Sequence, residues 1–149
     1  MKSDPLITYR RKPATLDAES LQTFAEVLRD RVARGREFHC RITNDAELQS
    51  LNAQFRGNDY PTDVLSFPNG HGVADQWLGD IAISIQRARA RAREYHHAPE
   101  DEIRILMLHG VLHLLGMDHE SDSGQMKRTE MRWRRKLGLP IGLIERSRQ

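Results

Sequence analysis

Three histidines lie close together in the stretch 108–120, which reads LHGVLHLLGMDHE. If His109 and His113 are helical, the four-residue spacing places them on one face, with about 5–6 Å between their Cβ atoms. Two imidazoles at that separation can bind one metal ion, because Zn–N bonds are about 2.0–2.1 Å long. Gly116 has no Cβ and can end the helix in a left-handed conformation, so that His119 folds back as a third ligand. Three protein ligands with one open position are typical of a catalytic zinc site.

The alternative is that these histidines are ordinary core or surface residues. A single histidine on an apolar helix is more often such a residue than a ligand, and two can share a spacing by chance. Three histidines, with a glycine placed to fold back the third, favour a metal site. Zinc is the first expectation for three nitrogen donors, and nickel or another transition metal is possible.

The three histidines and Gly116 have the spacing of the metzincin protease motif, H-E-x-x-H-x-x-G-x-x-H. The chain differs from that motif at its second position. There the proteases carry a glutamate that takes a proton from the bound water, whereas this chain has Gly110. Peptide hydrolysis therefore needs another base, such as Glu120. It is the weaker alternative.

Length and composition predict one globular domain. The 149 residues are enough for a single core, so we expect one domain over residues 1–149. Hydrophobic residues make up 38% and charged residues 30%, which is typical of a soluble protein. Cys40 is the one cysteine, so we expect no internal disulfide and a reducing compartment. No apolar run approaches the ~18 residues of a membrane span, and no signal peptide is recognisable. We expect a cytoplasmic protein with no membrane partner.

Hydrophobic periodicity and helix-capping residues predict the elements that position the histidines. We expect strands at 6–9, 38–43, 63–67 and 77–85, and helices at 17–35, 44–57, 86–95, from 99, and from 122 or 123 to 138. The helix that begins at Pro99 buries Ile105, Leu108 and Leu112 against the sheet and carries His109 and His113. The predicted fold is α+β, a single domain with about four strands in a mixed sheet, packed helices, and a zincin-like helix that bears the histidines.

One known family has the same blocks of residues. The run His109-Gly110-x-Leu112-His113-Leu114-x-Gly116-x-Asp118-His119 resembles the signature of the YbeY family, bacterial endoribonucleases of ribosomal RNA maturation. Leu51-Asn52, Phe55-Arg56 and the segment 61–68 (PTDVLSFP) resemble the family's central block, and Gly79-Asp80-Ile81 resembles the next. The blocks extend over about residues 44–130. Met117 stands where the family usually has tyrosine, so we expect altered packing beside the metal.

The resemblance implies an activity and a set of site residues. It implies that His109, His113 and His119 bind one zinc ion and that Arg56 is functionally important near the metal. We therefore expect Arg56 and His113 to be catalytic. The implied activity is cleavage of single-stranded RNA, including processing at the 3′ end of small-subunit ribosomal RNA and a part in ribosome quality control. The implied partners are single-stranded RNA, ribosomal RNA and the small ribosomal subunit.

The chemistry of phosphodiester cleavage explains why an arginine such as Arg56 would lie near the metal. Phosphodiester cleavage places extra negative charge on phosphoryl oxygens. A metal ion can stabilise that charge as a Lewis acid, and a guanidinium can hold two oxygens at once. The alternative is a solvated cation at a helix C-terminus, which the macrodipole favours. The residues alone favour this alternative, whereas the resemblance favours the phosphate role.

Several polar residues near these blocks have two readings. Asp118 could orient an imidazole of the metal site or cap the turn after Gly116. Asp63 could face the site or cap a turn, and Ser66 could bind phosphate or end a strand. His71, His96 and His97 have no metal spacing of their own, and we expect them at the surface.

Arginines and lysines gather in two clusters that could track a phosphate backbone. Arg87 with Arg91, and Arg89 with Arg93, are like-charge pairs four residues apart, which cost helix stability. Lys127, Arg128, Arg132, Arg134, Arg135 and Lys136 form the second cluster. The RNA-binding candidates are Arg87, Arg91, Arg128 and Arg132. The alternative is a solvated face, partly neutralised by Glu94 and Glu130, because the net charge is only +2.

The sequence therefore carries three functional hypotheses. The first is a zinc-dependent endoribonuclease specific for single-stranded RNA. The second is a metallopeptidase with an unrecognised base, and the third is a non-catalytic ribosome maturation factor with structural zinc. For the nuclease, a metal-bound hydroxide, the 2′-hydroxyl of the substrate or a phosphate oxygen could take part in the proton transfer.

Overall fold

A four-stranded mixed sheet forms the centre of the computed structural model, which describes residues 5–57, 62–70 and 76–140. The strands are β1 (Ile7–Tyr9), β2 (Glu37–Thr43), β3 (Val64–Pro68) and β4 (Trp77–Ser84). Their order is β1-β2-β4-β3. The strands β1, β2 and β4 run parallel to one another, and β3 runs antiparallel to β4. The predicted α+β class with a mixed sheet is confirmed.

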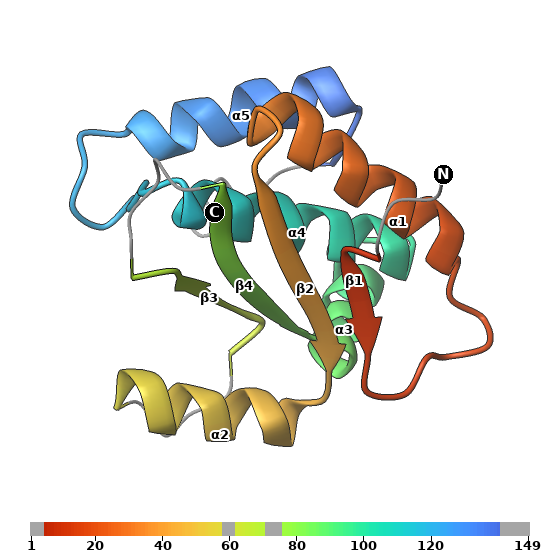
Figure 1. Cartoon of the computed structure of the whole chain (residues 1–149). Helices are drawn as coiled ribbons and strands as arrows, with labels where there is room; N and C mark the ends of the chain where they lie inside the picture. The colour runs from red at the N-terminus through yellow and green to blue at the C-terminus, as the bar shows by residue number, and fades with distance from the viewer. Residues whose placement is uncertain (1–4, 58–61, 71–75, 141–149) are drawn as a thin grey trace.

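The two faces of the sheet pack against different helices. The helices are α1 (Ala18–Val27), continued by a π-helical turn η1 (Leu28–Val32), α2 (Asp45–Arg56), α3 (Ile85–Glu94), α4 (Pro99–Leu114) and α5 (Gln125–Leu137). Ile81 and Ile83 of β4 belong to the main core, whereas Ala82 belongs to a small cluster with Leu48 of α2 and Leu65 of β3. Successive strand residues point to opposite faces. Accordingly, α4 lies behind the sheet in Figure 1, whereas α2 lies away from α4, below β3.

Helix α4 is the most buried helix, and the sequence explains both of its ends. Pro99 occupies the first turn, where a missing N–H costs nothing, and Glu100, Asp101 and Glu102 complement the positive end of the macrodipole. Ile105, Leu108 and Leu112 are at most 1% exposed, as the periodicity predicted. The helix ends before Gly116, whose φ of 93° is the left-handed conformation expected of it.

Two predictions about single residues are wrong. His97, expected at the surface, has a side chain only 10% exposed, and its Nε2 lies 3.3 Å from the buried carboxylate of Glu102. Glu130, counted among the acids that neutralise a solvated face, is 1% exposed. Helical periodicity did not reveal the His97 contact, because His97 precedes α4 whereas Glu102, five residues later, lies within it. His71 lies outside the described residues.

The last helix begins slightly later than predicted. Helix α5 starts at Gln125, and the carboxylate of Asp122 accepts hydrogen bonds from the backbone N–H groups of Gly124 and Met126. Asp122 therefore caps the N-terminus of the helix from outside it. Within residues 5–57, 62–70 and 76–140, no helix has both the length and the apolar character that crossing a bilayer requires.

Candidate metal centre

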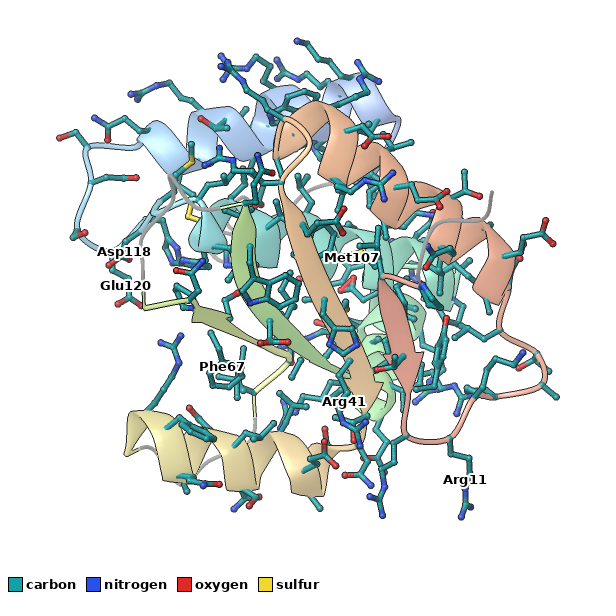
Figure 2. All side chains as sticks on the ribbon, in the orientation of Figure 1. Arg11, Arg41, Phe67, Met107, Asp118 and Glu120 are labelled. Atoms are coloured by element: carbon teal, nitrogen blue, oxygen red, sulfur yellow. The ribbon has the colours of Figure 1, made fainter. Side chains whose placement is uncertain are left out.

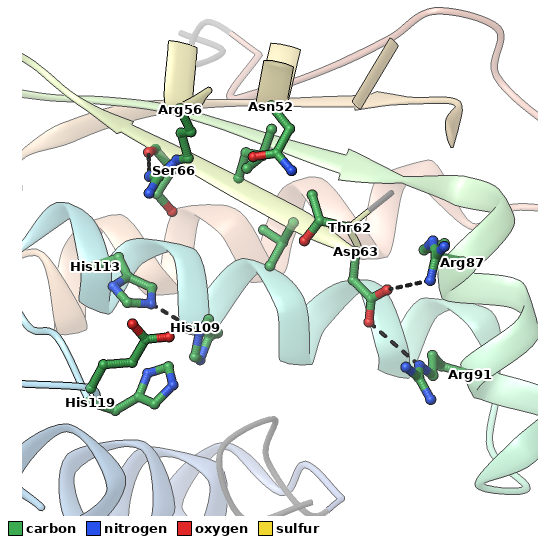
Figure 3. A pocket seen from close by; sticks show the side chains of 13 residues that line it. Asn52, Arg56, Thr62, Asp63, Ser66, Arg87, Arg91, His109, His113 and His119 are labelled. Carbon is green, nitrogen blue, oxygen red and sulfur yellow. Dashed lines mark hydrogen bonds and ion pairs between the residues drawn. The ribbon is translucent and has the colours of Figure 1, made fainter. Parts of the chain in front are cut away.

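His109, His113 and His119 converge in the structure, as the sequence predicted. The first two lie one turn apart on α4, and the third lies on the loop that joins α4 to α5, next to the labelled Asp118 and Glu120 of Figure 2. The ring centroids are 4.6 Å apart for His109 and His113, and 5.7 and 5.8 Å from each of these to His119. One ring nitrogen from each residue lies within 4.8 Å of the other two. This is a three-histidine group that could bind a metal ion (Figure 3).

Neighbouring acceptors determine which ring nitrogens are available for a metal. The Nδ1–H of His109 donates to Oε2 of Glu130 at 2.7 Å. The Nδ1–H of His113 donates to the backbone carbonyl of Met117 at 2.9 Å, where Gly116 has turned the chain back. Because a neutral imidazole carries one N–H, both Nε2 atoms then present lone pairs. Such contacts from the second ring nitrogen are typical of metal-binding histidines.

Two further observations test whether these residues suit a metal ion. The Nε2 atoms of His109 and His113 lie 3.1 Å apart, and two lone pairs at that separation repel unless a cation or a proton lies between them. Nδ1 of His119 is buried and has no hydrogen-bond partner among the described residues. A buried polar atom without a partner costs free energy, which a bound cation or a solvent molecule can relieve. The donor set therefore fits a transition metal that prefers imidazole nitrogen.

The ionisation of His113 agrees with this. Burial lowers the pKa of His113 to about 4, and the nearby His109 shifts it in the same direction. The ring is therefore neutral at neutral pH, the state that an imidazole ligand requires.

Arg56 reaches the same region from the other side of the cavity. It is the last residue of α2, and its Nη2 donates to the backbone carbonyl of Ser66 on β3 at 2.6 Å. The hydroxyl of Ser66 in turn donates to the backbone carbonyl of Gly110 on α4 at 3.1 Å. Ser66 lies in the middle of β3 and does not end the strand, and its hydroxyl links the sheet to the histidine-bearing helix.

Gly110 lies where the helix touches the sheet. A Cβ added at Gly110 would lie 3.0–3.1 Å from three side-chain atoms of Ile81 on β4. A side chain at this position would thus enter the packed contact with the sheet. Glu120, the other base considered for peptide hydrolysis, does line the cavity with the histidines.

A cavity of about 550 Å³ unites most of the predicted site. It is lined by Asn52, Arg56, Thr62, Asp63, Val64, Leu65, Ser66, Arg87, Arg91, His109, His113, His119 and Glu120. Figure 3 places Arg56, Ser66 and the histidines toward one side, and Asp63 with Arg87 and Arg91 toward the other. Arg128 and Arg132 are not in this cavity; they line a separate shallow pocket on α5. The fold therefore separates the two predicted RNA-binding pairs.

Glu130 is the site residue that the sequence reasoning missed. Asp118 was a candidate for orienting an imidazole, because it adjoins His119, and equally for capping the turn after Gly116. In the structure Oδ1 of Asp118 accepts from the backbone N–H of Glu120 at 3.0 Å, which is the turn-capping role. Within the described part of the chain, no hydrogen bond joins Asp118 to an imidazole. The only available signal for Glu130 was an acidic residue at a helical core position beside Met126 and Trp133.

Comparisons with known proteins give matches over most of the chain. The family model described as "Endoribonuclease YbeY" matches residues 7–138. A protein of that name from Solibacter usitatus is 59% identical over 140 residues, which cover 94% of this chain and 92% of that protein. One from Koribacter versatilis is 43% identical over 142 residues, covering 95% and 91%. A solution structure of a Thermotoga maritima protein matches with a TM-score of 0.58 at 27% identity, covering 85% of each chain.

Proposed function

This chain belongs to the YbeY family of endoribonucleases, and we propose that it is a zinc-dependent endoribonuclease that cleaves single-stranded RNA. An endoribonuclease role, with RNA as the substrate, follows from the family. The zinc, the strand specificity and the site residues are the proposal. We also propose that residues 1–149 form a single domain and that the protein acts in the cytoplasm.

The observation that carries the proposal is the shared cavity of the three histidines and Arg56. His109, His113 and His119 would hold one zinc ion; nickel is the next candidate for three imidazole donors. When bound, the metal would supply Lewis-acid stabilisation of negative charge on a phosphoryl oxygen. Glu130 and the Met117 carbonyl would keep the two Nε2 atoms of α4 directed at it.

Arg56 would bind and orient the phosphate. One of its N–H groups donates to the Ser66 carbonyl, which anchors the guanidinium beside β3. A guanidinium has five N–H donors, so others remain for the phosphoryl oxygens. It stays charged at any working pH and can hold two oxygens with a planar pair of hydrogen bonds. This chemistry suits a phosphodiester better than a peptide.

The direct test combines RNA cleavage with metal analysis of the same samples. The substrate is a labelled single-stranded RNA, with a duplex of the same sequence and an unstructured protein as further substrates. We expect the wild type to cut only the single strand. His113→Ala should lose metal and cutting together. Arg56→Ala should keep the metal and cut about 100-fold more slowly, the usual cost of removing a group that stabilises transition-state charge.

Two variants serve as controls for Arg56. Arg56→Lys keeps the charge but cannot hold two oxygens in a plane, so it should restore only part of the rate. Arg93→Ala removes an exposed arginine of α3 outside the cavity and should cut like the wild type. Equal cutting by all variants contradicts the proposal and favours a non-catalytic maturation factor. Protein cleavage that His113→Ala abolishes favours the metallopeptidase.

We further propose that the physiological substrate is ribosomal RNA within the small subunit, where the protein acts at the 3′ end and in quality control. The support is the family membership. Small subunits with an unprocessed 3′ end should be shortened by the wild type and not by His113→Ala. Cleavage of free RNA without any action on these particles contradicts the ribosomal part of the proposal alone.

A further inference from the structure

The cavity at the histidines extends to two arginines that the proposed reaction does not use. Arg87 and Arg91 line it together with Asp63, away from the histidines in Figure 3. A volume of about 550 Å³ lies within the range of pockets that hold whole small molecules, so it exceeds the needs of one phosphate group. The part of the cavity beside α3 is therefore available to a second portion of the substrate.

Asp63 holds both guanidinium groups loosely. Its two carboxylate oxygens lie 3.7 Å from Nη1 of Arg87 and 3.5 Å from Nε of Arg91. Nε of Arg87 also lies 3.6 Å from Oδ1 of Asp45, too far for a hydrogen bond, and Nη1 of Arg91 donates to Glu94 at 3.0 Å. Charge-assisted hydrogen bonds are usually about 2.7–2.9 Å long. Among the described residues, the contacts of Arg87 with carboxylates, at 3.6 and 3.7 Å, are longer than that.

Arg87 thus differs from the arginines that have a structural partner. Nε of Arg41 donates to Glu47 at 2.5 Å, and Nη1 of Arg104 donates to Asp101 at 2.9 Å. The Nε of Arg87, by contrast, is buried without a hydrogen-bond partner among the described residues. A buried donor without a partner is unfavourable, and a phosphate oxygen would satisfy it.

The sequence spacing of the two arginines points in the same direction. Residues four apart on a helix are neighbours, so Arg87 and Arg91 repel each other and weaken α3. A second such pair, Arg89 and Arg93, lies on the same helix but outside the cavity. These two pairs have the same residue types and spacing, and only one of them lines the cavity of the histidines.

We infer that Arg87 and Arg91 form a subsite for a phosphodiester of the RNA strand adjacent to the one at the histidines. The inference rests on the proposed function, because it extends the same cavity along the same strand. Planar guanidinium groups bind phosphate oxygens in pairs, and the repeated charge of a nucleic acid brings a second phosphate with the first. In the free protein the Asp63 carboxylate forms ion pairs with the two arginines, and the phosphate replaces it when the RNA binds.

The test compares two double variants that remove the same charge from α3. One is Arg87→Gln with Arg91→Gln, and the control is Arg89→Gln with Arg93→Gln. Both are assayed with metal bound on a labelled single-stranded RNA over a series of salt concentrations. For the first we expect KM to rise about tenfold, with a smaller change in kcat. The slope of log(kcat/KM) against log salt should become shallower by about 0.7, the value for one phosphate contact on a single strand. The control should keep the wild-type KM and slope.

Asp63→Asn separates phosphate binding from a structural role of the ion pairs. It removes the ion pairs of Asp63 with Arg87 and Arg91 but leaves both arginines in place. Because it removes the competing carboxylate, the inference predicts a lower KM. A rise in KM equal to that of the Arg87 and Arg91 variant overturns the inference, because loss of the ion pairs then explains both results.

The remaining outcomes distinguish the subsite from the proposed function. If the wild type cuts RNA and the two double variants have equal KM and slope, the subsite is wrong and the nuclease stands. If the wild type cuts no RNA, the nuclease is wrong, and anisotropy of the same labelled RNA decides the subsite. Weaker binding by the Arg87 and Arg91 variant than by the control then supports the subsite, and equal binding overturns it.

Discussion

The carboxylate of Glu130 on α5 accepts a hydrogen bond from Nδ1 of His109 on α4 at 2.7 Å. Both side chains are buried, with 1% and 6% of their surface exposed. In a neutral imidazole this contact places the N–H on Nδ1, so that the lone pair of Nε2 is available toward the other two histidines. A residue 21 positions away along the chain thus decides how the first histidine can serve as a ligand.

Replacing Glu130 should weaken metal binding without removing a ligand. We expect Glu130→Gln to lower zinc affinity about 10- to 100-fold, the usual effect of losing a carboxylate that orients a ligating histidine. Competition with a chromophoric chelator at fixed pH measures the zinc affinity of each variant. Glu19→Gln, an exposed acidic position on α1, is the matched control. Equal zinc affinity in both variants would contradict the role of Glu130.

Replacing Gly110 should destabilise the protein although alanine is the better helix former. An alanine Cβ would lie 3.0–3.1 Å from atoms of Ile81, which is 1% exposed and has little room to move. Overpacking usually costs about 1–3 kcal/mol, more than the gain of about 1 kcal/mol from helix propensity. We expect Gly110→Ala to lower the free energy of unfolding in urea by about 1–2 kcal/mol.

A double-mutant cycle identifies the cause of that loss. Ile81→Val removes Cδ1, one of the three atoms near the added methyl group. The double variant should therefore be less destabilised than the sum of the two single variants. Additive effects would mean that Gly110 and Ile81 do not clash.

Ser66 should contribute to stability through its contact with α4. Its side-chain hydroxyl donates to the Gly110 carbonyl, and the residue is 5% exposed. We expect Ser66→Ala to cost about 1 kcal/mol in the free energy of unfolding, a typical value for one hydrogen bond. Ser121→Ala, an exposed serine of the loop before α5, should cost much less. Equal losses in the two variants would remove the reason to regard Ser66 as a link between the sheet and α4.

Cys40 should be unreactive in the folded protein. Burial raises the pKa of its thiol to about 12 from the ordinary value of 9.0, and only the thiolate reacts with disulfide reagents. At pH 8 we expect no reaction in native buffer and one equivalent per chain in urea. Rapid labelling of the native protein would show that the strand opens or that the thiol is accessible.

The same pKa shift predicts how stability changes in alkali. Between pH 9 and about pH 12 the unfolded chain loses the Cys40 proton while the folded chain keeps it. The folded state then binds more protons, so the free energy of unfolding falls as the pH rises. Cys40→Ala should show a smaller fall over this range, measured by urea unfolding at several pH values. An unchanged slope would contradict the assignment to Cys40.

Residues close together in the chain were sufficient to predict much of this protein. The strands, the helices, the end of α4 at Gly116 and the convergence of His109 with His113 depend on periodicity and on capping, which are local properties. The return of His119 was predictable as well, because Gly116, three residues after His113 and three before His119, limits where the chain can go. The family resemblance added Arg56 to the predicted site. The residues around Arg56 alone favoured a solvated cation at a helix end.

Contacts between distant segments were decided only by the tertiary structure. Glu130 reaches His109 because α5 packs on α4, and the two residues are 21 positions apart, so neither sequence neighbourhood reveals its partner. Arg87 and Arg91 lie in the cavity of the histidines, whereas Arg128 and Arg132 do not, although both pairs have the same spacing. Spacing determines which side chains share a face of a helix, and packing determines what that face meets.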